Sequence, residues 1–272
     1  MNYSKILVED QNSIRTITLN RPERRNAMTP EMQAELIHVL GDTSSSDRRV
    51  LVLTGAGDAF CSGLDLSVLQ AMHDKTASDH HADAERITKL FVALYDLRIP
   101  TIAAVHGPAI AGGAGLAAIC DFTLATPASK FGFTEARIGF VPALVSVFLA
   151  LQIDGRHVRD LLLTGRIIDA VEAYRIGLVN EVVAPGELTQ RVQTLADTLI
   201  ANSPQSIKVT KQLIAAQNKE WLETSIAQAL KANALSRETA DFREGITAFL
   251  EKRKPAWGTS SGPWPRPTRR PN

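Results

Sequence analysis

The chain has 272 residues, of which 44% are hydrophobic and 22% charged, as is typical of globular proteins. Its 30 basic and 29 acidic residues leave a net charge of +1, which argues against binding nucleic acid through a broad basic surface. The only two cysteines, Cys61 and Cys120, exclude a disulfide framework and favour a reducing compartment.

The first half of the chain is predicted to be rich in strands. A helix is predicted between the second and third of them, with Thr29 as N-cap, Pro30 in the first turn and its end at Gly41. The polar stretch His73–Asp83 predicts a mobile surface loop, followed by a helix over about 84–97. The predicted strands are Lys5–Glu9, Ile14–Leu19, 49–54, Thr101–Val105 and Phe122–Ala125.

The second half is predicted to be mainly helical, with one short strand over 179–183. This order indicates an α/β core over 1–200, a helical region over 201–254 and a proline-rich, extended or disordered tail over 255–272. The predicted helices span 143–152, 155–163, 169–175, 186–201, 204–217, 219–236 and 241–251.

Neither the N-terminal residues nor the apolar runs of the chain predict a membrane protein. The first residues include Glu9 and Asp10 and lack the apolar centre of a secretory signal. The longest apolar run, 140–151, is interrupted by Pro142 and is shorter than the ~20 residues that a membrane span requires. We therefore expect a cytoplasmic protein.

Two glycine-bearing turns each follow a predicted buried strand. One contains Gly112 and Gly113, which either allow close packing or open a helix whose backbone N–H groups face a cleft. The other spans 59–66. One N–H from each turn would form a two-point oxyanion hole. Cys61 lies in the second turn, but no histidine is near it in sequence, so a nucleophilic role is given little weight.

Glu135 is the lone carboxylate of an apolar segment, 130–142. One interpretation is a surface or helix-end glutamate paired with Arg137. The other is a buried carboxyl whose raised pKa suits a general acid or base near neutral pH.

Taken together, these stretches resemble the crotonase (enoyl-CoA hydratase/isomerase) family, in one collinear order over about residues 5–257. The similar stretches are Asn20–Ala27, 53–66, 99–107, 112–113, 120–121, 130–132, 134–135, 163–165, 177–183 and 243–255.

The resemblance implies an α/β spiral of ββα units, with C-terminal helices that pack into a homotrimer or a hexamer built as a dimer of trimers. It implies an acyl-CoA thioester as substrate, with coenzyme A present only as part of that substrate. The spacing of the cysteines and histidines, including His80 and His81, predicts no metal site. The oxyanion hole would be the N–H groups of Leu64 and Gly112, and Glu135 would be the catalytic carboxylate. The residues that would contact CoA are Arg25, Ala27, Ser62, Leu64, Asp65, Leu66, Gly112 and Lys252.

The chain also departs from the family pattern. Typical hydratases of the family hold a water between two glutamates, and the first of these positions is Gly115 here, whereas the second is Glu135. The segment after Pro142 is bulky instead of glycine-rich. Both departures resemble bacterial methylglutaconyl-CoA hydratases.

These observations favour an enoyl-CoA hydratase, acting on a branched or methylglutaconyl-like 2-enoyl-CoA through Glu135. The alternative is a Δ3,Δ2-enoyl-CoA isomerase, for which one glutamate suffices. Thioester hydrolysis or decarboxylation, and a CoA-binding protein without catalysis, are two further hypotheses.

Overall fold

The computed structural model describes residues 3–258, and its centre is a six-stranded sheet. A hairpin joins the first two strands, and every later strand of the sheet pairs in parallel. In sheet order the strands are β1 (Ile6–Gln11), β2 (Ile14–Leu19), β3 (Val50–Gly55), β4 (Thr101–Val105), β6 (Phe122–Ala125) and β9 (Glu181–Val182).

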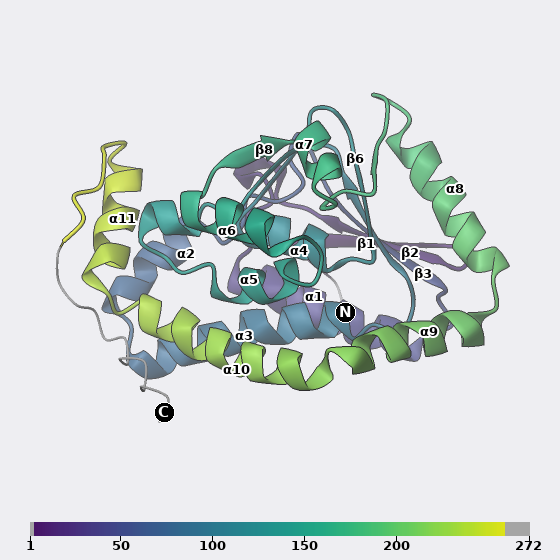
Figure 1. The fold of residues 1–272 in the computed structure, drawn as a ribbon, viewed down its shortest axis with the longest axis horizontal. Helices are drawn as coiled ribbons and strands as arrows, with labels where there is room; N and C mark the ends of the chain where they lie inside the picture. The colour runs from purple at the N-terminus through teal and green to yellow at the C-terminus, as the bar shows by residue number, and fades with distance from the viewer. Residues whose placement is uncertain (1–2, 259–272) are drawn as a thin grey trace.

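Helices surround this sheet on both faces (Figure 1). They are α1 (Pro30–Ser45), α2 (Leu66–Ala71), α3 (Ala77–Tyr95), α4 (Gly112–Ile119), α5 (Ala143–Leu149), α6 (Gly155–Thr164), α7 (Ala170–Arg175), α8 (Leu188–Ala201), α9 (Pro204–Gln217), α10 (Lys219–Ser236) and α11 (Ala240–Leu250). Short 3-10 helices are η1 (Pro22–Arg24), η2 (Met72–Asp74) and η3 (Glu135–Ile138).

The central strands are apolar on both faces because both faces are covered. Val52 and Ile102 pack toward Val192 of α8, whereas Leu51 and Ala103 belong to the larger core shared with α1, α3 and α4. All five residues of β4 are buried. The continuous apolar runs that predicted buried strands at 49–54 and 101–105 are thus explained.

A second sheet of three short strands stands beside the first: β5 (Pro108–Ile110), β7 (Lys130–Gly132) and β8 (Ile167–Asp169). The chain enters β5 through Gly107, where a Cβ atom would lie 2.1 Å from the carbonyl oxygen of Asp58. The succession β4, β5, α4 forms one ββα unit of the predicted spiral. The sequence did not indicate these strands, because three residues are too few to show a period.

The first helix begins as predicted but ends later. Thr29 caps it by accepting a hydrogen bond from the N–H of Met32 at 3.3 Å. The helix then continues past Gly41 to Ser45, since Gly41 is exposed and keeps helical backbone, and a Cβ atom at this position would meet no other atom within 4 Å. The prediction that Gly41 ends the helix was wrong.

The predicted loop over His73–Asp83 was also wrong beyond its first residues. Thr76 and Asp79 form a reciprocal capping box that starts α3 at Ala77. His80 and Asp83 lie inside that helix and are buried. Their burial depends on partners elsewhere in the chain. The polar composition of the segment therefore did not indicate that these side chains are buried in a helix.

The C-terminal helices follow the predicted ranges closely. In Figure 1, α9 and α10 run along one edge of the molecule, and α10 packs on α3 and α5. No described helix is both long and apolar enough to cross a membrane. Residues 255–258 have no regular secondary structure, and the rest of the predicted tail, 259–272, lies outside the described residues.

Candidate active site

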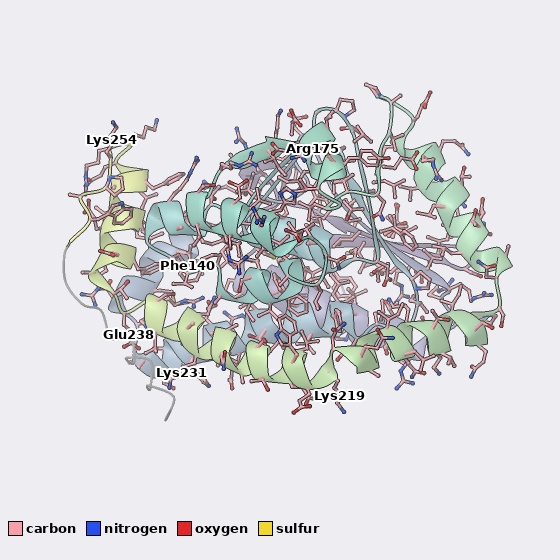
Figure 2. The ribbon with its side chains drawn as sticks, in the orientation of Figure 1. Phe140, Arg175, Lys219, Lys231, Glu238 and Lys254 are labelled. Atoms are coloured by element: carbon pink, nitrogen blue, oxygen red, sulfur yellow. The ribbon has the colours of Figure 1, made fainter. Side chains whose placement is uncertain are left out.

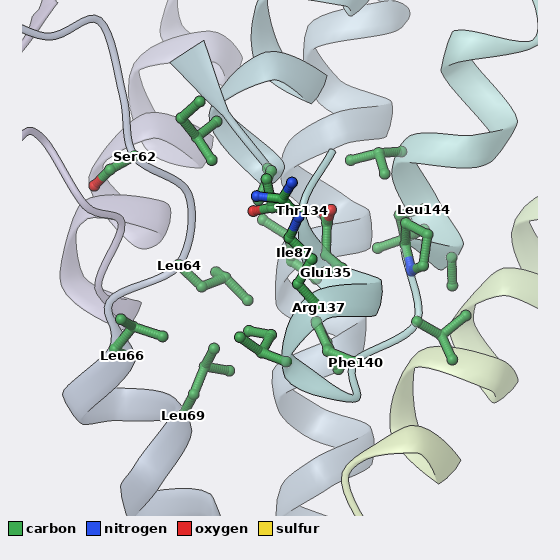
Figure 3. Close-up of a pocket in the computed structure, with 18 of the residues that line it drawn as sticks. Ser62, Leu64, Leu66, Leu69, Ile87, Thr134, Glu135, Arg137, Phe140 and Leu144 are labelled. Carbon is green, nitrogen blue, oxygen red and sulfur yellow. The ribbon is translucent and has the colours of Figure 1, made fainter. Parts of the chain in front are cut away.

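A cavity of about 560 Å³ lies where the two glycine-bearing turns meet α3, η3 and α5. Its wall is mostly apolar, as Figure 3 shows around Glu135, with Leu64, Leu66 and Leu69 on one side and Leu144 on another. A volume of this size suits a small-molecule ligand. The polar residues of the lining are Arg25, Ser62, Thr134, Glu135, Arg137 and Asn233.

The two turns are in direct contact. Gly63 has a φ of +89°, and a Cβ atom there would lie 3.0 Å from that of Ala111 and 3.4 Å from the backbone nitrogen of Gly112. A Cβ at Gly113 would lie 2.2 Å from the carbonyl oxygen of Cys61. Glycine is therefore required at positions 63 and 113 for the turns to approach this closely.

The approach places two free donors on the cavity wall. Within the described part of the chain, neither the N–H of Leu64 nor that of Gly112 has a hydrogen-bond acceptor. Gly112 is the first residue of α4, so the positive end of the helix dipole adds to its N–H. Ala111 just before it has a φ of 51°, a costly conformation for alanine that aims the Gly112 N–H. Paired free donors of this kind stabilise an oxyanion.

Glu135 is 6% exposed and begins η3 on the cavity wall. Its Oε2 atom has no hydrogen-bond partner among the described residues. Burial raises the pKa of its carboxyl to about 7, because the charged form is desolvated and no cation compensates it. Both protonation states are thus accessible at neutral pH, as general acid–base catalysis requires.

The predicted pairing of Glu135 with Arg137 is wrong. No ion pair joins the two side chains, and within residues 3–258 the Arg137 guanidinium has no hydrogen-bond or ionic partner. Instead, the stem of Arg137 packs at Gly165, where a Cβ would lie 3.1 Å from its Cγ. The second interpretation of Glu135, a buried acid or base, fits the geometry.

Apolar side chains fill the space that a side chain at position 115 would need. A Cβ at Gly115 would lie 2.7 Å from Cγ1 of Val145 and 3.0 Å from Cε2 of Phe91. Both of these residues line the cavity. The site therefore has a single carboxylate because its core is packed for glycine at position 115.

Most of the residues predicted to contact CoA lie on this cavity. Those that line it are Arg25, Ser62, Leu64, Leu66 and Gly112. Ala27 is buried beside it and does not line it. Asp65 does not line the cavity: its carboxylate is engaged by Arg21 at 2.9 Å and caps α2 through Ser67, and its N–H donates to the carbonyl of Met28. Lys252 follows α11 and does not line the cavity.

Cys61 is fully buried, and desolvation raises the pKa of its thiol to about 12, which disfavours the thiolate that a nucleophile needs. Sequence reasoning missed other wall residues: Phe91, Val145, Asn233 and Phe249. They come from α3, α5, α10 and α11. These helices come together only through tertiary packing, which leaves no pattern in the local sequence.

Comparison with known proteins identifies the family of this chain. The family model described as enoyl-CoA hydratase/isomerase matches residues 9–260. The chain belongs to this family. The family assignment makes the protein an enzyme of the enoyl-CoA hydratase/isomerase type and confirms the resemblance described above.

Several relatives extend over nearly the whole chain. A Thermus thermophilus protein assigned as an enoyl-CoA hydratase is 42% identical over 247 residues, which are 90% of this chain and 98% of that protein. The crotonyl-CoA hydratase of Syntrophomonas wolfei is 34% identical and covers 93% and 98%. The (E)-benzylidenesuccinyl-CoA hydratase of Thauera aromatica is 33% identical and covers the same shares.

The fold matches solved structures of the family. An enoyl-CoA hydratase from Mycobacterium avium superposes with a TM-score of 0.82 at 32% identity, over 94% of this chain and 99% of that one. An enoyl-CoA hydratase/isomerase from Xanthobacter autotrophicus gives 0.85 at 29% identity, over 93% and 98%. The predicted α/β class with its helical C-terminal region is confirmed.

Proposed function

We propose that the protein adds water to a 2-enoyl-CoA thioester, or removes it from the 3-hydroxyacyl-CoA, with Glu135 as its single acid/base. The observation that carries this proposal is the position of a buried carboxyl, whose Oε2 has no partner among the described residues, in the same cavity as two free backbone donors. The thioester carbonyl oxygen accepts hydrogen bonds from the N–H groups of Leu64 and Gly112.

One carboxylate is enough for a stepwise addition. Ionised Glu135 takes a proton from water as the hydroxyl oxygen bonds to C3, and the electrons of the double bond move to the thioester oxygen. The oxyanion hole holds that enolate. Glu135 then returns its proton to C2, so that one water is consumed and no other reactant is needed. A pKa of about 7 suits both transfers.

CoA is proposed to lie along the turns that bear the oxyanion donors. Arg25 and Ser62 line the cavity there, next to the segment Leu64–Asp65–Leu66 and Gly112. Ala27 lies behind this wall, and Lys252 is assigned to a nucleotide phosphate, from its own or a neighbouring subunit.

A branched acyl group, such as that of methylglutaconyl-CoA, is the proposed substrate class. Phe140, Leu144 and Val145 give the acyl end broad apolar walls. Among the described lining residues, Arg25 and Arg137 are cations and Glu135 is the sole acid, which favours an anionic ligand. The name of the related benzylidenesuccinyl-CoA hydratase describes a branched acyl group with a second carboxyl group.

A Δ3,Δ2-isomerase is the second candidate function. The packing of Val145 and Phe91 against Gly115 favours it, since a single carboxylate that reaches C2 and C4 can move a double bond without water. The two reactions differ in mass: hydration adds one water, and isomerisation leaves the mass unchanged.

A mass-spectrometric turnover panel tests these proposals. It comprises crotonyl-CoA, 3-methylcrotonyl-CoA, 3-methylglutaconyl-CoA and a 3-enoyl-CoA, each with the wild type and Glu135→Gln. We expect water addition to 3-methylglutaconyl-CoA that Glu135→Gln abolishes. A 3-enoyl-CoA converted at constant mass, with no hydration, would establish the isomerase instead. Free CoA, loss of CO₂, or binding without turnover would indicate the thioesterase, decarboxylase or non-catalytic alternatives.

A homotrimer, or a hexamer of two trimers, is proposed for the assembly. Helix α9 buries none of its residues within its own chain and exposes Val209, Leu213 and Ile214. Exposed apolar groups on one helix are typical of a protein contact. Light scattering after size-exclusion chromatography distinguishes three and six copies of the 29.5 kDa chain from a monomer.

A further inference from the structure

Asn233 is a buried amide in the cavity wall that the proposed reaction does not use. It lies on α10, is 5% exposed, and lines the cavity together with apolar neighbours such as Phe140 and Leu144. A polar side chain so placed is costly unless each of its groups has a partner. The partners of its two ends are therefore informative.

The oxygen end of Asn233 is held by Arg237. Nη1 of Arg237 donates to both the side-chain Oδ1 of Asn233 and its backbone oxygen, the latter at 2.8 Å. Arg237 is 0% exposed and is itself fixed by Asp83, whose Oδ2 lies 2.5 Å from Nη2. Its guanidinium also lies 5.0 Å above the ring of Phe140. Figure 2 shows Phe140 and Glu238, the residue after Arg237, at the end of the molecule where α10 leads to α11.

This arrangement fixes which end of the amide faces the cavity. Arginine has only donors, so Asn233 presents its oxygen to Arg237 and its Nδ2 group points away. Nδ2 has no hydrogen-bond partner among residues 3–258. It keeps some accessible surface, because the fully enclosed atoms that lack a partner do not include it. Asn233 lines the cavity, so the cavity is the space into which Nδ2 can open. A free, oriented donor is thus presented to the ligand.

The charges behind Asn233 favour a negatively charged acceptor. The carboxylate of Asp83 is shared by two guanidinium groups, those of Arg86 and Arg237. Nε2 of His80 is hydrogen-bonded to the backbone oxygen of Met72. The carboxylate of Glu238 lies 3.9 Å from Nδ1 of His80 and is more exposed than the histidine. Asp83 and its two guanidinium partners, the half-buried Arg86 and the buried Arg237, together carry one excess positive charge. A carboxylate also accepts hydrogen bonds more strongly than a neutral oxygen.

We propose that Asn233, oriented by Arg237, donates a hydrogen bond to a carboxylate on the acyl group and so selects acyl-CoA thioesters that carry a distal carboxylate. This inference rests on the proposed function, because it takes the cavity to be the acyl-CoA site. It assigns Asn233 to specificity and Arg237 to positioning, without a role in proton transfer for either.

Two saturated thioesters test the proposal by binding alone. Glutaryl-CoA and pentanoyl-CoA have acyl chains of equal length, and only the first ends in a carboxylate. By calorimetry, we expect the wild type to bind glutaryl-CoA about 10- to 100-fold more tightly, as a hydrogen bond to a charged group permits. Asn233→Asp keeps an oxygen for Arg237 but replaces the free donor with an acceptor, so it should abolish the preference and change pentanoyl-CoA affinity less than about 3-fold.

Asn233→Leu, which has a similar volume and no donor, is the second variant, and circular dichroism checks that each variant is folded. An equal preference in the wild type and both variants would overturn the proposal, as would a folded variant that loses affinity for both thioesters alike. Failure of the proposed hydration is a separate outcome: the turnover panel would then show no water addition, while the binding preference still depended on Asn233.

Discussion

Asp83 and Glu135 are both buried carboxyl groups, with exposed fractions of 4% and 6%, but their surroundings are opposite. Asp83 receives one guanidinium on each oxygen, from Arg86 and Arg237. Glu135 has no cation beside it, and its Oε2 has no hydrogen-bond partner among the described residues. The charge of Asp83 is therefore compensated by two guanidinium groups, and a charge on Glu135 would not be compensated by any described cation.

The difference separates a carboxylate that holds two helices together from a carboxyl that we propose as an acid/base. The carboxylate of Asp83, between two guanidinium groups, holds α3 to the end of α10. A desolvated carboxyl without a partner has its pKa raised toward neutrality, and such groups concentrate at functional sites. Burial alone is therefore a poor guide to function, and the partner of the buried charge is the informative observation.

The largest expected effect is on turnover. Glu135→Gln keeps the size of the side chain but removes the group that carries the proton, so kcat should fall about 10³- to 10⁴-fold. CoA binding, measured by calorimetry, should be nearly unchanged, because the contacts proposed for CoA lie on the two turns. If the variant were fully active, Glu135 would not be the acid/base.

The matching change at Asp83 should affect folding. Asp83→Asn leaves the fully buried Arg237 without its counter-charge, and breaking a buried ion pair costs about 3–5 kcal/mol. Urea unfolding measures this loss. Asp160→Asn is the control, because Asp160 pairs with Arg166 at the surface, where such a change costs at most about 1 kcal/mol. Equal losses in the two variants would refute the distinction.

The sequence left Glu135 open between a surface and a buried carboxyl, and it placed Asp83 in a surface loop, whereas both are buried. Glu135 is the lone carboxylate of an apolar segment, so its neighbours in the chain already describe its surroundings. The surroundings of Asp83 come from Arg237, which is 154 residues away in sequence. A polar stretch whose charges are compensated at long range cannot be told from a solvated loop by local pattern.

The same limit applies to the fold and to the rest of the site. Long helices and buried strands, such as Thr101–Val105 and Pro204–Gln217, match their predicted ranges, because period and capping are local. The three-residue strands of the second sheet and the wall residue Asn233 are set by tertiary packing. The position of Gly115 was evident from the sequence, but its reason, contact with Val145, required the structure.

The raised pKa of Glu135 also predicts a pH-dependent effect on stability. Its carboxyl titrates near 7 in the folded chain and near its ordinary value of 4.5 when unfolded, so folding loses stability as pH rises between these values. Glutamine does not titrate, so Glu135→Gln does not lose stability as the pH rises. The variant should therefore be more stable than the wild type by about 3 kcal/mol at pH 8, and by little at pH 4. An equal difference at both pH values would mean that Glu135 is not desolvated in the folded chain.

The smallest predicted effect concerns why position 115 carries no second carboxylate. In Gly115→Ala the new methyl group meets Val145 and Phe91, and such overpacking costs about 1–3 kcal/mol. The higher helix propensity of alanine offsets about 1 kcal/mol of that cost. Adding Val145→Ala opens the space, so the double variant should be more stable than the sum of the two single losses predicts. Additive losses in urea unfolding would show that Val145 does not limit this position, and the single-carboxylate site would then need a reason other than packing.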